Sequence, residues 1–127
     1  GLTASIAPSR TTSKVFVLIT LTAGSDTNYW NCRITRDGTA ITGALATSNG
    51  NRSAGTGSVW PAQTYGTYPM VVSYLDSPGT TATTAYGLLI GNSGTAATLC
   101  VNRSQEDSDT TGRTRGTSTI TIMEIAA

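Results

Sequence analysis

The chain has 127 residues and a formal net charge of +1, with eight basic side chains, seven acidic ones and no histidine. This length suits one domain with its own core, and the low charge argues against binding nucleic acid through its phosphates. The absence of histidine removes the commonest general base and the commonest zinc ligand. Threonine is the most abundant residue and 14 residues are glycine, which is typical of strands with polar faces and of tight turns.

The first predicted strand is residues 2–7, and a polar turn separates it from the strongest apolar run, residues 14–22. Every odd-numbered side chain from Val15 to Leu21 is apolar, which predicts a buried face. Phe16 and Leu18 begin the opposite face, so both faces of this strand are partly apolar. The many β-branched residues favour a strand over a helix.

A hairpin is predicted over the next stretch. Residues 29–35 alternate, and their even-numbered side chains are apolar, which predicts a strand with one face in the core. Asp37-Gly38 follows, and this dipeptide favours a type I′ turn because both central residues of that turn need positive φ. Residues 40–45 are predicted as the returning strand.

Residues 46–69 show no clear period, and irregular segments of this length are often functional. A short strand is expected around residues 58–63. The aromatic side chains of Trp60, Tyr65 and Tyr68 could form a binding platform, since sugar rings stack on aromatic faces and tyrosine adds a hydroxyl. The alternative is that these rings anchor the loop on the core.

Three further strands are predicted at residues 70–76, 83–91 and 96–102, the last two joined as a hairpin by a turn at 92–94. A polar loop then leads to the final strand, residues 117–125. No convincing helix and no internal repeat is present in the sequence. About eight short strands punctuated by turns predict a single all-β domain over residues 1–127, a sandwich or barrel.

The final strand carries apolar side chains on both faces. Ile120 and Ile122 lie on one face, whereas Met123 and Ile125 lie on the opposite face. A terminal strand usually has one wet face. The pattern therefore predicts either a central strand covered on both sides or a strand whose outer face meets another subunit.

Cys32 and Cys100 are not part of a CxxC motif. We predict two buried free thiols, because a small buried cysteine behaves as an apolar side chain. A disulfide between the two is the alternative, since one disulfide is the most that two cysteines allow.

The polar loop holds an acidic group, Glu106, Asp107 and Asp109. Its spacing lacks the glycine and the distal glutamate of an EF-hand, so we predict solvated charges rather than a metal site. Arg113 and Arg115 could pair with these carboxylates across the loop. No metal or cofactor is expected.

No catalytic site is predicted, and we expect that the protein is not an enzyme. The sequence has no Gly-x-Ser-x-Gly motif, no histidine base and no evident pair of carboxylates on one strand face. It also lacks a signal-like segment and an apolar run long enough for a membrane-spanning helix, so membrane insertion is not expected. Because the sequence begins at Gly1 without methionine, we expect a processed or excised piece of a longer chain.

Several segments together resemble a small β-domain found at the C-terminal ends of phage virion proteins, especially tail fibres. They are Ser13-Lys14-Val15, Arg36-Asp37-Gly38-Thr39, Tyr74-Leu75-Asp76-Ser77-Pro78, Asn102-Arg103-Ser104-Gln105 and the ending Gly116 to Glu124. The resemblance covers most of the chain after Ser5, but not residues 46–69. It implies a jelly-roll-like antiparallel β-sandwich, a homotrimer, a place in the virion and no catalytic residues.

The resemblance and the two-faced strands lead to one expected function and two alternatives. The first is a trimeric tail-fibre or appendage domain for host attachment, with other virion proteins and a host-surface glycan as partners. Its oligomer interface is expected at Phe16, Leu18, Met123 and Ile125, because a large apolar patch is normally covered. The alternatives are a capsid decoration protein that stabilises the head and a free-standing lectin-like glycan-binding module.

Overall fold

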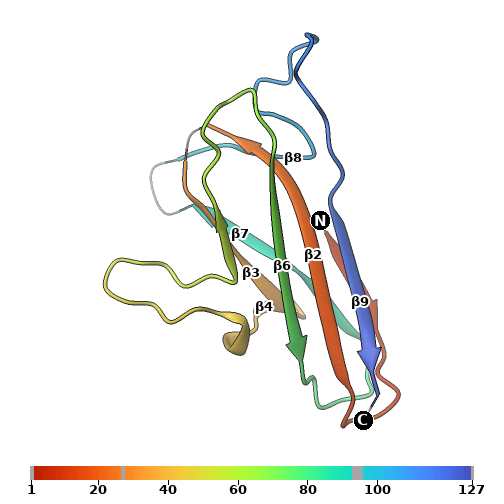
Figure 1. The fold of residues 1–127 in the computed structure, drawn as a ribbon. Coiled ribbons are helices and arrows are strands. Elements are labelled where there is room, and N and C mark those ends of the chain that lie inside the picture. Colours follow the sequence, from red (N-terminus) through yellow and green to blue (C-terminus); the bar gives the residue numbers. More distant parts are fainter. Residues whose placement is uncertain (1, 27, 93–95, 127) are drawn as a thin grey trace.

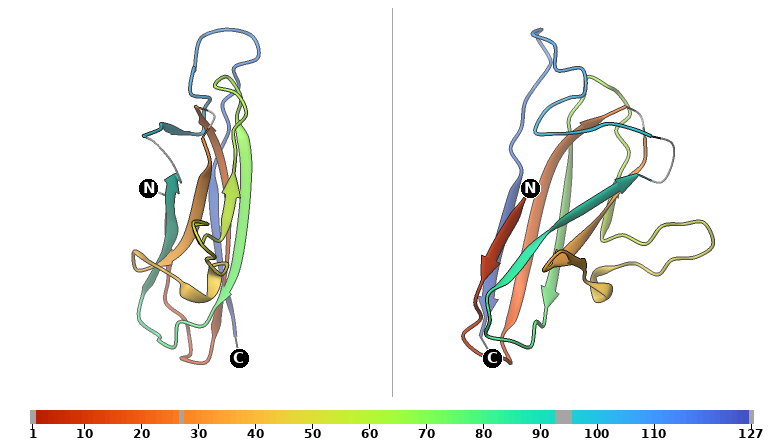
Figure 2. Two further views of the ribbon diagram at one scale, coloured as in Figure 1. Left: turned by 90° about the vertical axis from the view of Figure 1, so that its left-hand side faces the viewer. Right: turned by 180° about the vertical axis from the view of Figure 1, so that it is seen from behind.

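The computed structural model describes residues 2–26, 28–92 and 96–126, and in it two antiparallel β-sheets pack face to face (Figure 1). Seen from the side, the sheets form two layers (Figure 2). Within the described residues the helical content is one 3-10 turn, η1 (Thr42–Ala44). The predicted all-β sandwich is confirmed, with nine strands in these residues where about eight were expected.

The first sheet runs in the order β1, β7, β3, β4, and β5 also pairs with β3. Its strands are β1 (Thr3–Ile6), β7 (Thr84–Asn92), β3 (Trp30–Arg36), β4 (Thr39–Ala40) and β5 (Gly57–Val59). Because β7 occupies one edge of β3, β4 and β5 share the other edge. This sheet is therefore organised around β3.

The second sheet is organised around β2 (Lys14–Ser25), the longest of the described strands. β6 (Tyr68–Asp76) pairs along one edge of β2. The other edge is divided between two strands, β9 (Thr119–Ile125) at the start of β2 and β8 (Leu99–Val101) at its end.

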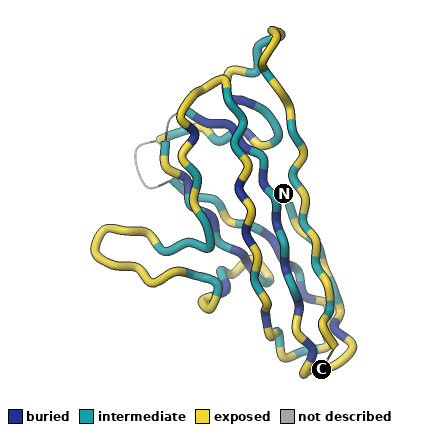
Figure 3. The backbone as a smooth tube through the Cα atoms, viewed as in Figure 1, coloured by how far each residue is buried: buried dark blue, intermediate teal, exposed yellow. Residues whose placement is uncertain are grey.

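The core lies between the two sheets and follows from the alternation along their central strands (Figure 3). Val15, Val17 and Ile19 of β2 are completely buried, as are Cys32 and Ile34 of β3. Full burial of a valine or isoleucine side chain stabilises a fold by roughly 1.5–3 kcal/mol. The predicted inward faces of both strands are therefore confirmed.

The hairpin predicted at Asp37-Gly38 is confirmed, but its returning strand is much shorter than expected. Asp37 and Gly38 have φ values of 50° and 79°, as a type I′ turn requires. β4 ends at Ala40, and the chain turns through η1 instead of continuing to residue 45. The reason is that β5 occupies the rest of this edge of β3. β5 is also the short strand expected around residues 58–63. It begins one residue earlier than predicted, at Gly57, and ends at Val59.

The prediction that residues 96–102 pair back on the preceding strand is wrong. β8 pairs with the end of β2 in the other sheet, where Ala23 lies opposite Val101. This is possible because β2 continues to Ser25, three residues beyond its predicted end at Thr22. Asn92 ends β7, and the rest of the predicted turn lies outside the described residues.

Gly24 allows the chain after β8 to approach β2 closely. A Cβ atom built on Gly24 would lie 2.6 Å from the carbonyl oxygen of Arg103 and from the Cα atom of Ser104. Real Cβ atoms do not come this close to a backbone, so any other residue would push the two segments apart.

The final strand is an edge strand, so the alternative that it is central and covered on both sides is wrong. β9 pairs with β2 on one side, and no described strand pairs with its other side. Its split into two faces is confirmed. Ile120 and Ile122 pack against the core, whereas Met123 and Ile125 are exposed on the outside of the sheet.

Candidate functional site

The second sheet has an apolar outer face. It is formed by Phe16 and Leu18 of β2, Val71 and Leu75 of β6, and Met123 and Ile125 of β9. The strand register places Leu75 and Met123 directly on either side of Phe16, so the three side chains form a row across the sheet. We call these six side chains the apolar outer face.

Several of these side chains are far more exposed than is usual for their type. Val71 is 62% exposed, Met123 48% and Ile125 47%. The structure thus brings together all the interface residues predicted from the sequence, and it adds Val71 and Leu75. The alternation of β6, with Val72 buried between exposed Val71 and Ser73, contained the signal for these two. Alternation along β6 does not by itself show that this side of the strand lies beside Phe16 and Leu18.

Polar side chains border the apolar outer face. Towards the middle of the sheet, Leu18 lies between Ser73 and Thr121, and in the next row Thr20 lies between Val71 and Thr119. At the other end, Lys14 lies beside Ile125 and is exposed. An apolar centre with a polar rim is the usual anatomy of a protein interface.

The three aromatic residues predicted as one platform have three different surroundings. Trp60 stacks on Tyr29, with ring centroids 5.1 Å apart and an angle of 23° between the ring planes. The guanidinium of Arg113 lies over the ring of Tyr65, 4.9 Å from its centroid. Tyr68 is half-buried at the start of β6.

Trp60 and Tyr29 are both free of the core, with 55% and 58% of their surfaces exposed. Trp30 shows the contrast, because it is buried and its indole N–H donates to Ser25 Oγ at 2.6 Å. Trp60 therefore does not anchor the loop on the core. Tyr29 is not among the predicted site residues, because alternation places it only on the outward side of the predicted strand 29–35.

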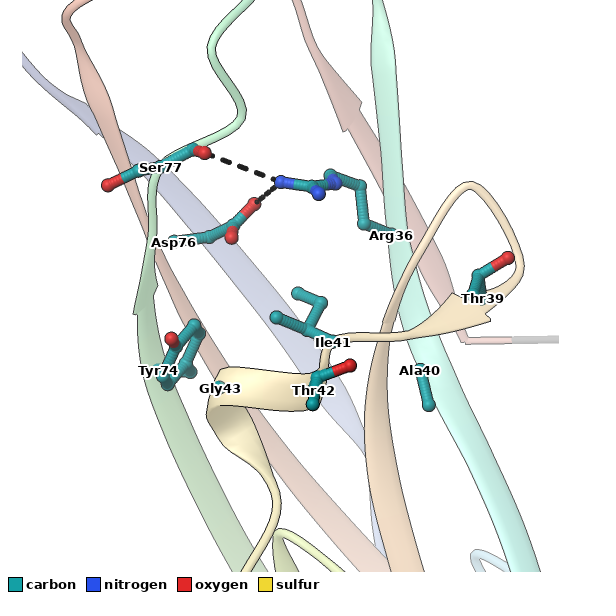
Figure 4. A pocket seen from close by; sticks show the side chains of 9 residues that line it. All are labelled: Arg36, Thr39, Ala40, Ile41, Thr42, Gly43, Tyr74, Asp76 and Ser77. Carbon is teal, nitrogen blue, oxygen red and sulfur yellow. Dashed lines mark hydrogen bonds and ion pairs between the residues drawn. The ribbon is translucent and has the colours of Figure 1, made fainter.

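A cleft of about 470 Å³ lies between the β3–β4 hairpin with η1 and the end of β6 (Figure 4). Here Arg36 Nη1 donates to Asp76 Oδ2 at 2.9 Å and to the carbonyl of Ser77 at 3.5 Å. The hydroxyl of Tyr86 donates to the same Asp76 oxygen at 2.8 Å. Arg36 and Tyr86 belong to one sheet and Asp76 to the other, so this network ties the two sheets together.

Burial of Tyr86 raises the pKa of its hydroxyl far above the ordinary value, and the hydrogen bond to Asp76 and the negative charge of Asp76 raise it further. Tyr86 is therefore a fixed donor and not an acid at any ordinary pH. Because Asp76 is 4% exposed and already accepts bonds from two side chains, we interpret the cleft as a structural tie.

The acidic loop is neutralised by its own arginines, as predicted. Arg113 pairs with Glu106 at 3.0 Å. Arg115 Nε and Nη2 donate to the two carboxylate oxygens of Asp107 at 3.1 and 2.9 Å. Within the described residues, no group of three histidine, cysteine, aspartate or glutamate side chains could hold a metal ion.

Both cysteines are buried free thiols, which confirms that prediction and excludes the disulfide. Cys32 Sγ lies 3.5 Å from Met70 Sδ in the core. Burial raises the pKa of the Cys32 thiol to about 11, against a small lowering by a backbone hydrogen bond at Gly57. Such a thiol is poorly reactive.

No protein-family model matches the chain, and no curated protein sequence matches it. In the part of the chain that the structure describes, no helix is long and apolar enough to cross a membrane.

Proposed function

We propose that this chain is a structural domain of a phage virion, a trimeric tail-fibre or appendage domain that assembles through its apolar outer face. The observation that carries the proposal is the row of Leu75, Phe16 and Met123 across three neighbouring strands. The resemblance of the sequence segments to C-terminal domains of virion proteins supports the choice of a virion.

The energetic reason is the cost of leaving this face in water. Burial of apolar surface contributes about 25 cal/mol per Å², so covering several large side chains on each subunit favours association strongly. Scattered exposed apolar residues need no explanation, but a contiguous group on a regular sheet indicates a partner surface. A second and third copy of the chain are the simplest partners.

Cyclic symmetry follows from a partner of the same kind. Identical chains usually associate with closed cyclic symmetry, of which dimers and trimers are the smallest cases. β9 forms the edge of this sheet and carries Met123 and Ile125, so we place β9 nearest the symmetry axis. An edge strand also gains from being covered, because its free backbone groups otherwise invite unwanted pairing.

The mass of the protein in solution tests this proposal. At micromolar concentration, light scattering is expected to give three times the protomer mass of 13.1 kDa. Met123→Lys and Ile125→Lys each place a charge within the apolar outer face, and both variants are expected to be monomers with an unchanged circular dichroism spectrum.

Leu89→Lys is the matched control. Leu89 is 50% exposed, much like Met123, but it lies on the outer face of the other sheet, so this variant is expected to remain trimeric. A monomeric wild-type protein would contradict the proposal, and so would a Met123→Lys variant that stays trimeric.

A further inference from the structure

A groove of about 420 Å³ lies beside the exposed Tyr29, on the first sheet. Asn31 of β3 and Ser58 of β5 form its floor, since these two residues pair across the strands. Tyr29 lies on one side of the groove. The opposite wall comes from the loop between η1 and β5, which projects from the side of the sandwich (Figure 1). That wall consists of Asn51, Arg52 and Ser53.

A second hollow of about 310 Å³ continues the groove along the same sheet. It shares Asn31 and Ser53 with the first and extends to Arg33 and Leu89. Gly91 lies opposite Asn31 in the register and carries no side chain, which keeps the floor low. Both volumes fall within the range of roughly 300–1,000 Å³ that small-molecule sites occupy.

Both hollows are positively charged. Arg52 lines the first and Arg33 the second, and no acidic side chain is among the described residues that line them. Arg33 Nε donates to the carbonyl of Ala54 at 2.9 Å, and Arg52 Nε donates to the carbonyl of Asn49 at 3.2 Å. These bonds position both guanidinium groups, each of which has further N–H donors in a fork that matches a carboxylate or phosphate.

The aromatic pair at the mouth of the groove supplies an apolar stacking surface. Tyr29 lines the groove and Trp60 stacks on it, and more than half of each side chain is exposed. Large rings that cover no part of the core are costly to leave in water, unless they meet a ligand. Amides, hydroxyls and guanidinium groups lie directly beside them, which is the combination that recognises a sugar.

We propose that this groove binds an acidic oligosaccharide. One sugar ring stacks on the Tyr29–Trp60 pair, its hydroxyl groups bond to Asn31 and Asn51, and a carboxylate or phosphate on the chain pairs with Arg52. The inference rests on the proposed attachment function, which it deepens by naming the class of molecule that the domain would contact.

The first test is a printed array of oligosaccharides probed with the purified chain. It should hold neutral backbones beside the same backbones carrying uronic acid, sialic acid, phosphate or sulfate. We expect binding to acidic members, weakened as salt is raised. The strongest acidic member is then titrated in solution, with quenching of tryptophan fluorescence as the signal. Absence of binding to every acidic member, or equal binding to neutral ones, would overturn the inference.

Variants then locate the site. Trp60→Ala and Arg52→Gln are each expected to raise the dissociation constant about tenfold, because a lost stacking contact or charged hydrogen bond is worth about 1.4 kcal/mol. Arg52→Gln should also reduce the salt dependence. Gly91→Leu should block the second hollow from its floor, where the nearest atom to the added Cβ, Asn31 Oδ1, lies 3.7 Å away.

Tyr65→Ala is the matched control. Tyr65 is an exposed aromatic in the same irregular segment but lines neither hollow, so its loss is expected to leave affinity unchanged. If Tyr65→Ala weakens binding as much as Trp60→Ala, the site is elsewhere. Titrations of variants without Trp60 use calorimetry in place of fluorescence.

The oligosaccharide proposal and the trimer proposal can fail independently of each other. The groove and the apolar outer face lie on different sheets, so Met123→Lys should bind the acidic oligosaccharide in solution with wild-type affinity for a single site. On the array it should bind more weakly, because a monomer lacks the avidity of a trimer. Groove variants should in turn keep the trimer mass.

Discussion

The two sheets present opposite kinds of surface to solvent. The outer face of β9, β2 and β6 is built from long, evenly paired strands and is apolar across all three strands at the row of Leu75, Phe16 and Met123. The outer face of β3, β5 and β7 is interrupted by a projecting loop and holds a positively charged groove with an aromatic pair at its mouth. Regular pairing aligns side chains into a flat patch suited to another copy of the chain, whereas interruption creates a hollow suited to a small ligand.

Breaking the hydrogen-bond network that joins the two sheets is expected to have the largest effect. Asp76→Ala removes the acceptor of Arg36 and Tyr86, leaving a buried hydroxyl without its partner. We expect the free energy of unfolding to fall by about 2–4 kcal/mol, measured by urea denaturation. Asp109→Ala, in the exposed loop, is the control and should change it by less than about 0.5 kcal/mol. Equal losses of unfolding free energy for the two substitutions would show that the network does not stabilise the fold.

Adjacent residues of β9 offer a sharper comparison of inside and outside. In an Ile125→Lys background, which keeps the protein monomeric, Ile122→Ser is expected to lower the free energy of unfolding by about 2 kcal/mol. Met123→Ser should lower it by less than about 0.5 kcal/mol, because Met123 does not contribute to the protomer's core. Similar losses for both would mean that Met123 stabilises the protomer rather than the assembly.

The core between the faces should protect its thiols. With a pKa of about 11, Cys32 carries only about a thousandth of its population as thiolate at pH 8. We expect iodoacetamide to leave the native protein unmodified over hours and to alkylate both cysteines in urea, as followed by mass spectrometry. Reactivity should appear in the native protein only as the pH approaches 11. Rapid alkylation at pH 8 would show that the two sheets separate readily.

The smallest expected effect is an extension of the apolar outer face. Thr121 lies on the same face of β9 as Met123, and it is the neighbour of Leu18 in the register. Thr121→Val should strengthen association by less than about 1 kcal/mol, which sedimentation at low concentration would detect as a lower dissociation constant. Ser58→Val makes a similar change on the other sheet and should leave association unchanged.

Much of the fold could be predicted because it depends on neighbours in the sequence. Alternation identified the buried faces of β2 and β3, and Asp37-Gly38 identified the hairpin through its local φ requirement. The pairing of β8 could not be predicted in this way. Nothing local to residues 96–102 distinguishes a strand that returns on β7 from one that crosses to β2.

The candidate sites show the same difference between features set by neighbours in the sequence and features set by distant contacts. Phe16, Leu18, Met123 and Ile125 were identified from strand periodicity, because alternation alone decides which face a side chain occupies. Tyr29 as the partner of Trp60 was missed, since the two rings meet only when β5 is laid beside β3.

By itself, then, the sequence predicted an all-β sandwich or barrel, two strands that are apolar on both sides, and buried free thiols with a disulfide as the alternative; the structure decided for the sandwich and the free thiols. The tertiary structure alone decided that Leu75, Phe16 and Met123 form one row and that Asn31, Arg52 and Tyr29 line one groove. The physical reason is that the direction of a side chain is a property of its own strand. A surface that can bind something depends on which strands become neighbours, and that choice is made by contacts distant in the sequence.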